Sequence, residues 1–154
     1  MTELELFHFL LPRIIGATAC GFIIGSEREM KHKVAGIRTH VVVCVGAALF
    51  ASFSFIILDS YDNIDHTRII SQIVTGVGFL GAGLIFKNED KVSGVTSAAF
   101  IWLTAAIGVV IGIGYLWTPI LFTIGFLILL LLLQKIEDKI EEIAKKKIKD
   151  NENR

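Results

Sequence analysis

The chain has 154 residues, of which 53% are hydrophobic, and its mean hydropathy is +0.67. A soluble domain of this length cannot bury that much apolar surface, so the composition excludes an ordinary soluble protein and predicts a lipid environment. The formal net charge is zero, which gives no basis for nucleic-acid binding. Most of the chain consists of long uncharged runs, and a tail rich in Lys and Glu follows Gln134.

Five apolar segments approach the length of about 20 residues that a membrane-spanning helix requires. The predicted spans are residues 6–25, 40–58, 69–86, 95–111 and 119–133. The last two lie in one uncharged run, which must fold back at the glycines, aromatic residues and proline of residues 112–119. Because acidic residues, and no basic region, precede the first span, we interpret it as a span and not as a cleaved signal peptide. The fold class is therefore all-α, a polytopic helical bundle with five transmembrane helices.

The orientation of the bundle follows from its Lys and Arg residues, which favour the cytoplasmic side of a membrane. Basic residues concentrate after the first and third spans and in the tail, whereas the segment 59–65 is acidic. With five spans, all the basic segments lie on one face, so we expect the N-terminus outside and the tail in the cytoplasm. Arg13, inside the first span, is expected to extend its side chain toward the outer interface.

The tail predicts an amphipathic helix that continues from the fifth span. Ile136, Ile140 and Ile143 recur at three- to four-residue spacing, and acidic residues precede lysines by four positions. Such a helix either lies on the inner membrane surface or pairs with a second copy. We therefore expect two parts, a membrane domain of residues 1–134 and a charged cytoplasmic tail of residues 135–154.

Small residues at four-residue intervals predict where the helices pack closely, because close approach drives helix association in lipid. The predicted packing glycines are Gly21, Gly25, Gly76, Gly78, Gly81, Gly83, Gly108 and Gly112. The third span is the richest in glycine, so we expect it at the centre of the bundle and the fifth span at the periphery. The glycine spacing after residue 76 matches a dinucleotide fingerprint, but it lacks the strand and acidic residue that the motif needs, so no cofactor is predicted.

Polar residues at the ends of the spans are the candidates for function, since ionisable groups near membrane depth are costly. Glu27, Arg28 and Arg38 suggest an ion-pair cluster on the cytoplasmic side, because the planar guanidinium group bonds carboxylates well. Topogenic charge at the interface is the simpler alternative for each residue alone. Gln72 lies one turn into the third span, where an amide needs a hydrogen-bond partner on a neighbouring helix, with contact to a substrate as the alternative.

The sequence contains only weak signs of metal binding or catalysis. Asp59, Asp62 and Asp65 in the outer loop are weak candidates for metal binding, and the alternative is that they are only solvated surface charges. No metal site is therefore assigned. The two cysteines, Cys20 and Cys44, lie in apolar runs without metal-ligand spacing. Without a nucleophile–base pair or a phosphate loop, the sequence predicts that the chain is not an enzyme.

Together these motifs resemble those of the MgtC/SapB family of bacterial and archaeal membrane proteins. The segments that carry the resemblance are residues 25–29 (GSERE), 35–40 (AGIRTH), 45–50 (VGAALF), 68–85 (RIISQIVTGVGFLGAGLI), 92–102 (VSGVTSAAFIW) and 105–112 (AAIGVVIG). They cover most of the first four predicted spans. The positions that match the family's polar motifs are Glu27, Arg28, Arg38, Thr39, Arg68, Gln72 and Thr96.

The resemblance implies a multi-pass cell-membrane protein linked to magnesium homeostasis or membrane energetics. In the family this role is regulatory and involves membrane partners, including the proton-translocating ATP synthase. Many members also carry a cytoplasmic domain of ACT-like fold after the last span, and the short charged tail predicts that this chain is the form without it. Besides the bilayer, we expect a homodimer or other homo-oligomer. The alternative function is a magnesium or small-ion transporter or channel that acts as an oligomer.

Overall fold

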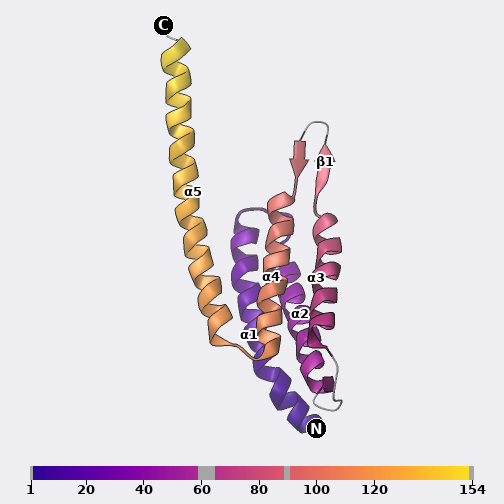
Figure 1. Ribbon diagram of the computed structural model, residues 1–154. Coiled ribbons are helices and arrows are strands. Elements are labelled where there is room, and N and C mark those ends of the chain that lie inside the picture. The colour runs from indigo at the N-terminus through magenta and orange to yellow at the C-terminus, as the bar shows by residue number, and fades with distance from the viewer. Residues whose placement is uncertain (1, 59–64, 89–90, 153–154) are drawn as a thin grey trace. The chain divides into compact units, whose positions relative to one another are not determined.

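The computed structural model describes residues 2–58, 65–88 and 91–152, and almost all of them are helical (Figure 1). The helices are α1 (Glu3–Met30), α2 (Ile37–Leu58), α3 (His66–Ala82), α4 (Val95–Ile113) and α5 (Trp117–Glu152), with a hairpin of β1 (Phe86–Asn88) and β2 (Lys91–Ser93) between α3 and α4. The all-α prediction is confirmed. The chain divides into two compact units, residues 1–123 and residues 124–154.

Among the described residues, four helices are long and apolar enough to cross a membrane, namely α1, α2, α4 and α5. The remaining helix, α3, has 17 residues and is shorter than these four. The predicted third span therefore corresponds to a shorter helix than expected. The chain is a multi-pass membrane protein by the length and composition of its helices.

Side-chain and backbone caps set the helix boundaries. The Thr2 side chain accepts a hydrogen bond from the Glu5 backbone while the Glu5 carboxylate accepts one from the Thr2 backbone, a capping box at the start of α1. Glu29 Oε2 accepts a hydrogen bond from the Ile37 backbone N–H at 2.8 Å, so the end of α1 supplies the cap of α2. Gly114, at a φ of 116°, ends α4 and allows the turn into α5 that the sequence predicted.

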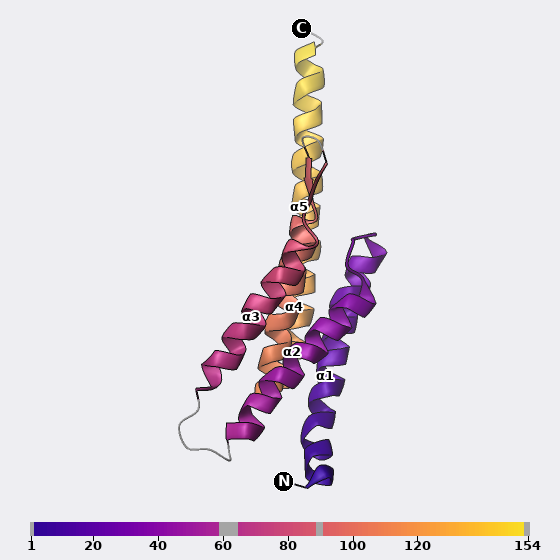
Figure 2. The same ribbon diagram turned by 90° about the vertical axis from the view of Figure 1, so that its right-hand side faces the viewer.

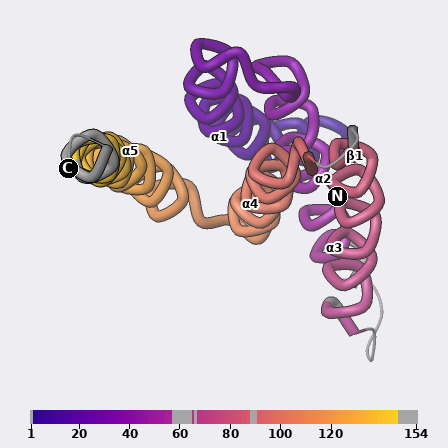
Figure 3. The backbone as a smooth tube through the Cα atoms, turned by 90° about the horizontal axis from the view of Figure 1, so that it is seen from above, coloured from indigo at the N-terminus to yellow at the C-terminus, as the bar shows by residue number. Residues whose placement is uncertain are grey.

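Helices α1, α2 and α4 lie side by side (Figure 2 and Figure 3), and they meet at glycines. A Cβ atom at Gly21 would lie 2.7 Å from Val41 Cα, and one at Gly25 would lie 2.5 Å from Ile37 Cα. On the other side of α2, a Cβ at Gly108 would lie within van der Waals overlap of the Cys44 carbonyl oxygen. Gly112 approaches α2 at Ala48 in the same way. Backbone-to-backbone contact of this kind is what small residues permit in membrane helices.

The centre of the bundle is formed by α2 and α4, which both contact α1 and α3 (Figure 3). Much of α3 is exposed, and Gly76 and Gly78 have no atom within 4 Å of an added Cβ among the described residues. The prediction that the third span is central is therefore wrong. Its contacts are confined to one side, where Ile73 and Val77 pack against Ala47, Ile101 and Ala105.

The segment after α3 is not helical as far as Phe86, which corrects the predicted end of the third span. The helix ends at Gly83, and the chain then forms β1, which pairs antiparallel with β2 in the register Phe86 opposite Ser93. The return into α4 requires Gly94, at a φ of 87°, because a Cβ there would clash with the Leu84 carbonyl oxygen. Pairing with β2 therefore replaces the helical hydrogen bonds that a longer α3 would have made.

The second unit consists of the rest of α5, which continues without a break to Glu152. The prediction that the tail extends the fifth span as a helix agrees with this. Glu141 and Lys145 form an ion pair along one side of it, at the spacing that the sequence indicated.

Candidate functional site

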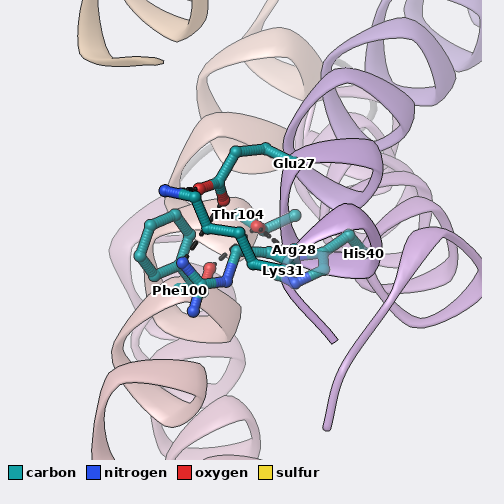
Figure 4. Close-up of polar contacts among 6 residues, drawn as sticks. All are labelled: Glu27, Arg28, Lys31, His40, Phe100 and Thr104. Carbon is teal, nitrogen blue, oxygen red and sulfur yellow. Dashed lines mark hydrogen bonds and ion pairs between the residues drawn. The ribbon is translucent and has the colours of Figure 1, made fainter. Parts of the chain in front are cut away.

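A buried charged cluster lies at the end of α1, where the helix continues beyond the predicted span to Met30 (Figure 4). Lys31 Nζ lies 2.7 Å from Glu27 Oε1, and Arg28 Nη1 lies 3.3 Å from Glu27 Oε2. The Glu27 and Arg28 side chains are 11% and 5% exposed. One buried carboxylate therefore faces two cations, and the cluster carries a net positive charge when all three groups are ionised.

Arg28 is held against α4. Its guanidinium carbon lies 4.0 Å from the centre of the Phe100 ring, so the planar cation stacks on the aromatic face (Figure 4). Within the described part of the chain, Arg28 Nε and Nη2 are buried without a hydrogen-bond acceptor. The cluster thus presents hydrogen-bond donors, and its one carboxylate, Glu27, is already paired with Arg28 and Lys31. A hard divalent cation needs several free oxygen ligands, so this arrangement does not suit it.

His40 and Thr104 connect α2 to α4 beside Arg28 (Figure 4). Thr104 Oγ1 donates to the Phe100 carbonyl oxygen at 2.8 Å and lies 2.8 Å from His40 Nδ1. Because the single hydroxyl hydrogen is used on Phe100, Nδ1 must be the donor to Thr104. Both side chains are fully buried. His40 could hardly be selected from the sequence, where it is one ionisable residue at the start of an uncharged run.

The structure brings only Glu27 and Arg28 together out of the seven predicted polar positions. Lys31 supplies the second cation at Glu27, in the place where Arg38 was expected. The other five have exposed side chains: Arg38, Thr39, Arg68, Gln72 and Thr96. A side chain at a helix end can point to either side of the helix, and the sequence spacing alone did not distinguish them.

A second locus is an open groove of about 410 Å³ between α2 and α3. Its walls are apolar apart from the amide of Gln72, and each wall contains one glycine, Gly46 on α2 and Gly76 on α3. Neither glycine has an atom within 4 Å of an added Cβ among the described residues. The groove therefore combines exposed backbone with one polar group at the depth of the spans, and we call it the α2–α3 groove.

Arg13 extends toward the N-terminal end of α1, where its Nη1 donates to the Phe9 carbonyl oxygen, and it also caps α4. Its Nε donates to the Gly112 carbonyl oxygen at 3.2 Å, and Ser52 Oγ donates to the same oxygen at 3.1 Å. The guanidinium group also lies 3.6 Å from the centre of the Phe9 ring. Terminal carbonyl groups carry partial negative charge, so a cation there is stabilising. The cap joins α1 and α2 to the last turn of α4.

The metal candidates fall largely outside the described residues. Asp59 and Asp62 lie outside the described residues. Asp65 caps α3, where its Oδ1 accepts hydrogen bonds from the Thr67 backbone N–H at 2.9 Å and from the Thr67 hydroxyl at 2.6 Å. In residues 2–58, 65–88 and 91–152, no three His, Cys, Asp or Glu side chains gather in a way that could hold an ion. Cys20 and Cys44 are buried free thiols.

Comparison with known proteins gives several similar chains. A family model described as the MgtC family matches residues 14–139. "Putative magnesium transporter YhiD" of Escherichia coli K12 is 48% identical over 112 residues, which cover 70% of this chain and 52% of the relative. "Protein MgtC" of Brucella abortus strain 2308 is 48% identical over 101 residues, covering 66% and 41% of the two chains. "Protein MgtC" of Salmonella typhimurium strain 14028s is 36% identical over 145 residues, covering 93% and 60%.

The chain thus spans about half the length of the curated relatives that it matches. No solved structure matches it. The match includes the buried charged cluster and both walls of the α2–α3 groove, since all of these residues lie between positions 14 and 139.

Proposed function

The chain belongs to the MgtC family, and we propose that it is a regulatory protein of the bacterial or archaeal cell membrane, linked to magnesium homeostasis or membrane energetics. It acts by helix contacts with other membrane proteins and not by catalysis. The link to magnesium rests on the name of the Escherichia coli relative and on the family.

The observation that carries the contact mechanism is the α2–α3 groove. Inside the chain, Gly21, Gly25, Gly108 and Gly112 each face the backbone of a neighbouring helix. Glycine in a helix costs about 1 kcal/mol relative to alanine, and close packing offsets that cost at these four positions. Gly46 and Gly76, by contrast, face open space, and they lie on opposite walls of one groove. A helix of another protein would restore the pattern.

Gln72 favours a helix over a lipid chain as the occupant of the groove. Its amide lines the groove and is exposed. An acyl chain cannot form a hydrogen bond with an amide, whereas a polar side chain or a backbone carbonyl on a neighbouring helix can. The partner that the family resemblance suggests is the proton-translocating ATP synthase.

A second candidate function is magnesium transport, favoured by the name of the Escherichia coli relative. The geometry of Glu27 supports it less well. This carboxylate is the acidic group of the buried cluster, and it is already paired with Lys31 and Arg28. A passing cation would have to displace both pairs and approach a net positive cluster.

The contact mechanism predicts that Gly76→Leu abolishes association with the partner. The leucine side chain would fill the groove beside Gln72, while the bundle would tolerate it because the space is open. The measurement is recovery of ATP synthase subunits with the tagged chain after mild detergent extraction of native membranes. Gly125→Leu is the matched control, because Gly125 is a second exposed helical glycine with open space around it.

Loss of the ATP synthase subunits in Gly76→Leu and their retention in Gly125→Leu would support the proposal. Equal recovery with both variants would show that the groove does not bind this partner. If the subunits are recovered with neither the parent chain nor the variants, the ATP synthase is not the partner.

A further inference from the structure

The part of α5 beyond the predicted fifth span carries an apolar seam that the proposed function does not use. Three isoleucines, Ile136, Ile140 and Ile143, are 54%, 61% and 59% exposed. Leu133 and Leu129 extend the same line toward the span, and they are 44% and 48% exposed. The spacings along this line are four, three, four and three residues, which is the a/d pattern of a heptad repeat.

The seam is narrow. Between residues 134 and 146, every position outside the three isoleucines is charged or polar except Ala144. A helix that packs on a globular core or lies on a bilayer has a broader apolar face, with three or four apolar residues in every two turns, whereas an a/d-only stripe is the pattern of a coiled coil. The width of the seam therefore favours another helix of the same kind as its cover.

The continuity of α5 argues against the bilayer surface as the cover. Its 36 residues form one unbroken helix, about 54 Å long at about 1.5 Å per residue. The hydrocarbon core is only about 30 Å thick, so a helix of this length is longer than the core that it crosses. To lie in the plane of the membrane, the tail would have to bend sharply at about Gln134, where the helix is continuous.

The charges flanking the seam also argue against the bilayer surface as its cover. Residues 135–146 contain Glu137, Asp138, Glu141 and Glu142 beside Lys135, Lys139, Lys145 and Lys146. A helix that binds anionic lipid has a predominantly basic polar face, and this one is balanced. Balanced charge also means that copies of the tail do not repel one another, and Glu141 and Lys145 already form an ion pair within one copy at a position off the seam.

We infer that residues 133–146 form a parallel coiled coil with the same segment of further copies of this chain. Parallel orientation follows because all copies insert in the membrane with the same topology. The seam is only two heptads long, which is marginal for free peptides in water. Anchoring in the same bilayer holds the tails side by side and raises their effective concentration. Isoleucine at both a and d positions favours three strands over two.

The inference adds self-association to the proposed regulatory function, and it holds whether or not the α2–α3 groove binds a partner. The test is disulfide crosslinking of the full chain in native membranes, after Cys20→Ala and Cys44→Ala remove the two buried thiols. Single cysteines replace seam residues (Ile136→Cys, Ile140→Cys, Ile143→Cys) or matched off-seam residues (Asp138→Cys, Glu142→Cys, Lys145→Cys). We expect crosslinked species at the three seam positions in several-fold higher yield than at the three others.

A second variant distinguishes crosslinks that form by packing along the seam from crosslinks that form by random collision of the tails. Ile140→Glu places a charge at the centre of the seam and should abolish the crosslink at Ile143→Cys, whereas Glu142→Gln should leave it unchanged. Uniform yield at all six positions, or a yield that Ile140→Glu does not change, would overturn the inference. So would protection of the seam cysteines from a water-soluble maleimide without crosslinking, which would place the tail on the bilayer. None of these results changes the expected loss of partner in Gly76→Leu, so the two proposals fail separately.

Discussion

Gly108→Ala is expected to lower the stability of the bundle strongly although it adds a single methyl group. The new Cβ would overlap the Cys44 carbonyl oxygen and lie 3.0 Å from Ala47 Cβ. The obstacle is backbone on one side and a short side chain on the other, so α2 and α4 must separate. Overpacking of this kind costs about 1–3 kcal/mol. The measurement is the melting temperature of the purified protein in detergent, read from the fraction that remains monodisperse after heating.

Gly46→Ala is the control for this effect, because Gly46 lies on the same α2 helix but has nothing within 4 Å of an added Cβ among the described residues. Alanine is a better helix former than glycine by up to about 1 kcal/mol, so this variant should be as stable as the parent or slightly more stable. Equal melting temperatures for Gly108→Ala and the parent chain would mean that α2 and α4 do not approach at this glycine.

Glu27→Gln should produce the second large effect. The glutamine has nearly the same shape, but it leaves Arg28 buried beside Phe100 without a carboxylate and removes the ion pair of Lys31. Removing one partner of a buried ion pair costs about 3–5 kcal/mol, because the remaining charge is uncompensated. We expect a large fall in the melting temperature, or loss of folded protein during purification.

Two comparisons make the Glu27 result specific. Lys31→Met should cost less, since the Lys31 side chain is 33% exposed and water can solvate part of its charge. Glu142→Gln, on the exposed surface of α5, should leave the melting temperature unchanged. If Glu27→Gln is as stable as the parent chain, Glu27 does not hold the cluster together, and a role in moving a cation becomes the better explanation of its position.

Much of the helical bundle can be predicted from the sequence because the bilayer limits the alternatives. Uncharged runs of sufficient length gave five helices, and the turn at Gly114 was visible from its glycines and proline. The small residues of the first and fourth spans, at Gly21, Gly25, Gly108 and Gly112, lie where helices meet. These features depend on residue type and spacing, which a single sequence contains.

The arrangement of α3 could not be predicted in the same way. Its glycines suggested a central helix, yet Gly76 and Gly78 face open space. Glycine spacing shows that a helix can be approached closely, but it does not show whether the neighbour belongs to the same chain. The hairpin was missed because strands of three residues have no detectable alternation.

The charged site was predicted only in part, for a related reason. Glu27 and Arg28 were selected correctly as neighbours in space, but consecutive residues are always close. The contacts of Lys31, Phe100, His40 and Thr104 depend on how α1, α2 and α4 are rotated about their axes. Arg13 shows the same dependence, because its cap of α4 joins residues that are 99 positions apart.

Magnesium entry into proteoliposomes that contain only this chain, read with a trapped magnesium-sensitive dye, distinguishes a regulatory protein from a transporter most directly. An ionophore added at the end confirms that the vesicles are sealed and that the dye responds. If the chain is regulatory, vesicles with folded, inserted protein should take up magnesium no faster than vesicles without protein. Saturable uptake that rises with the amount of protein would contradict it, and would make the chain a transporter.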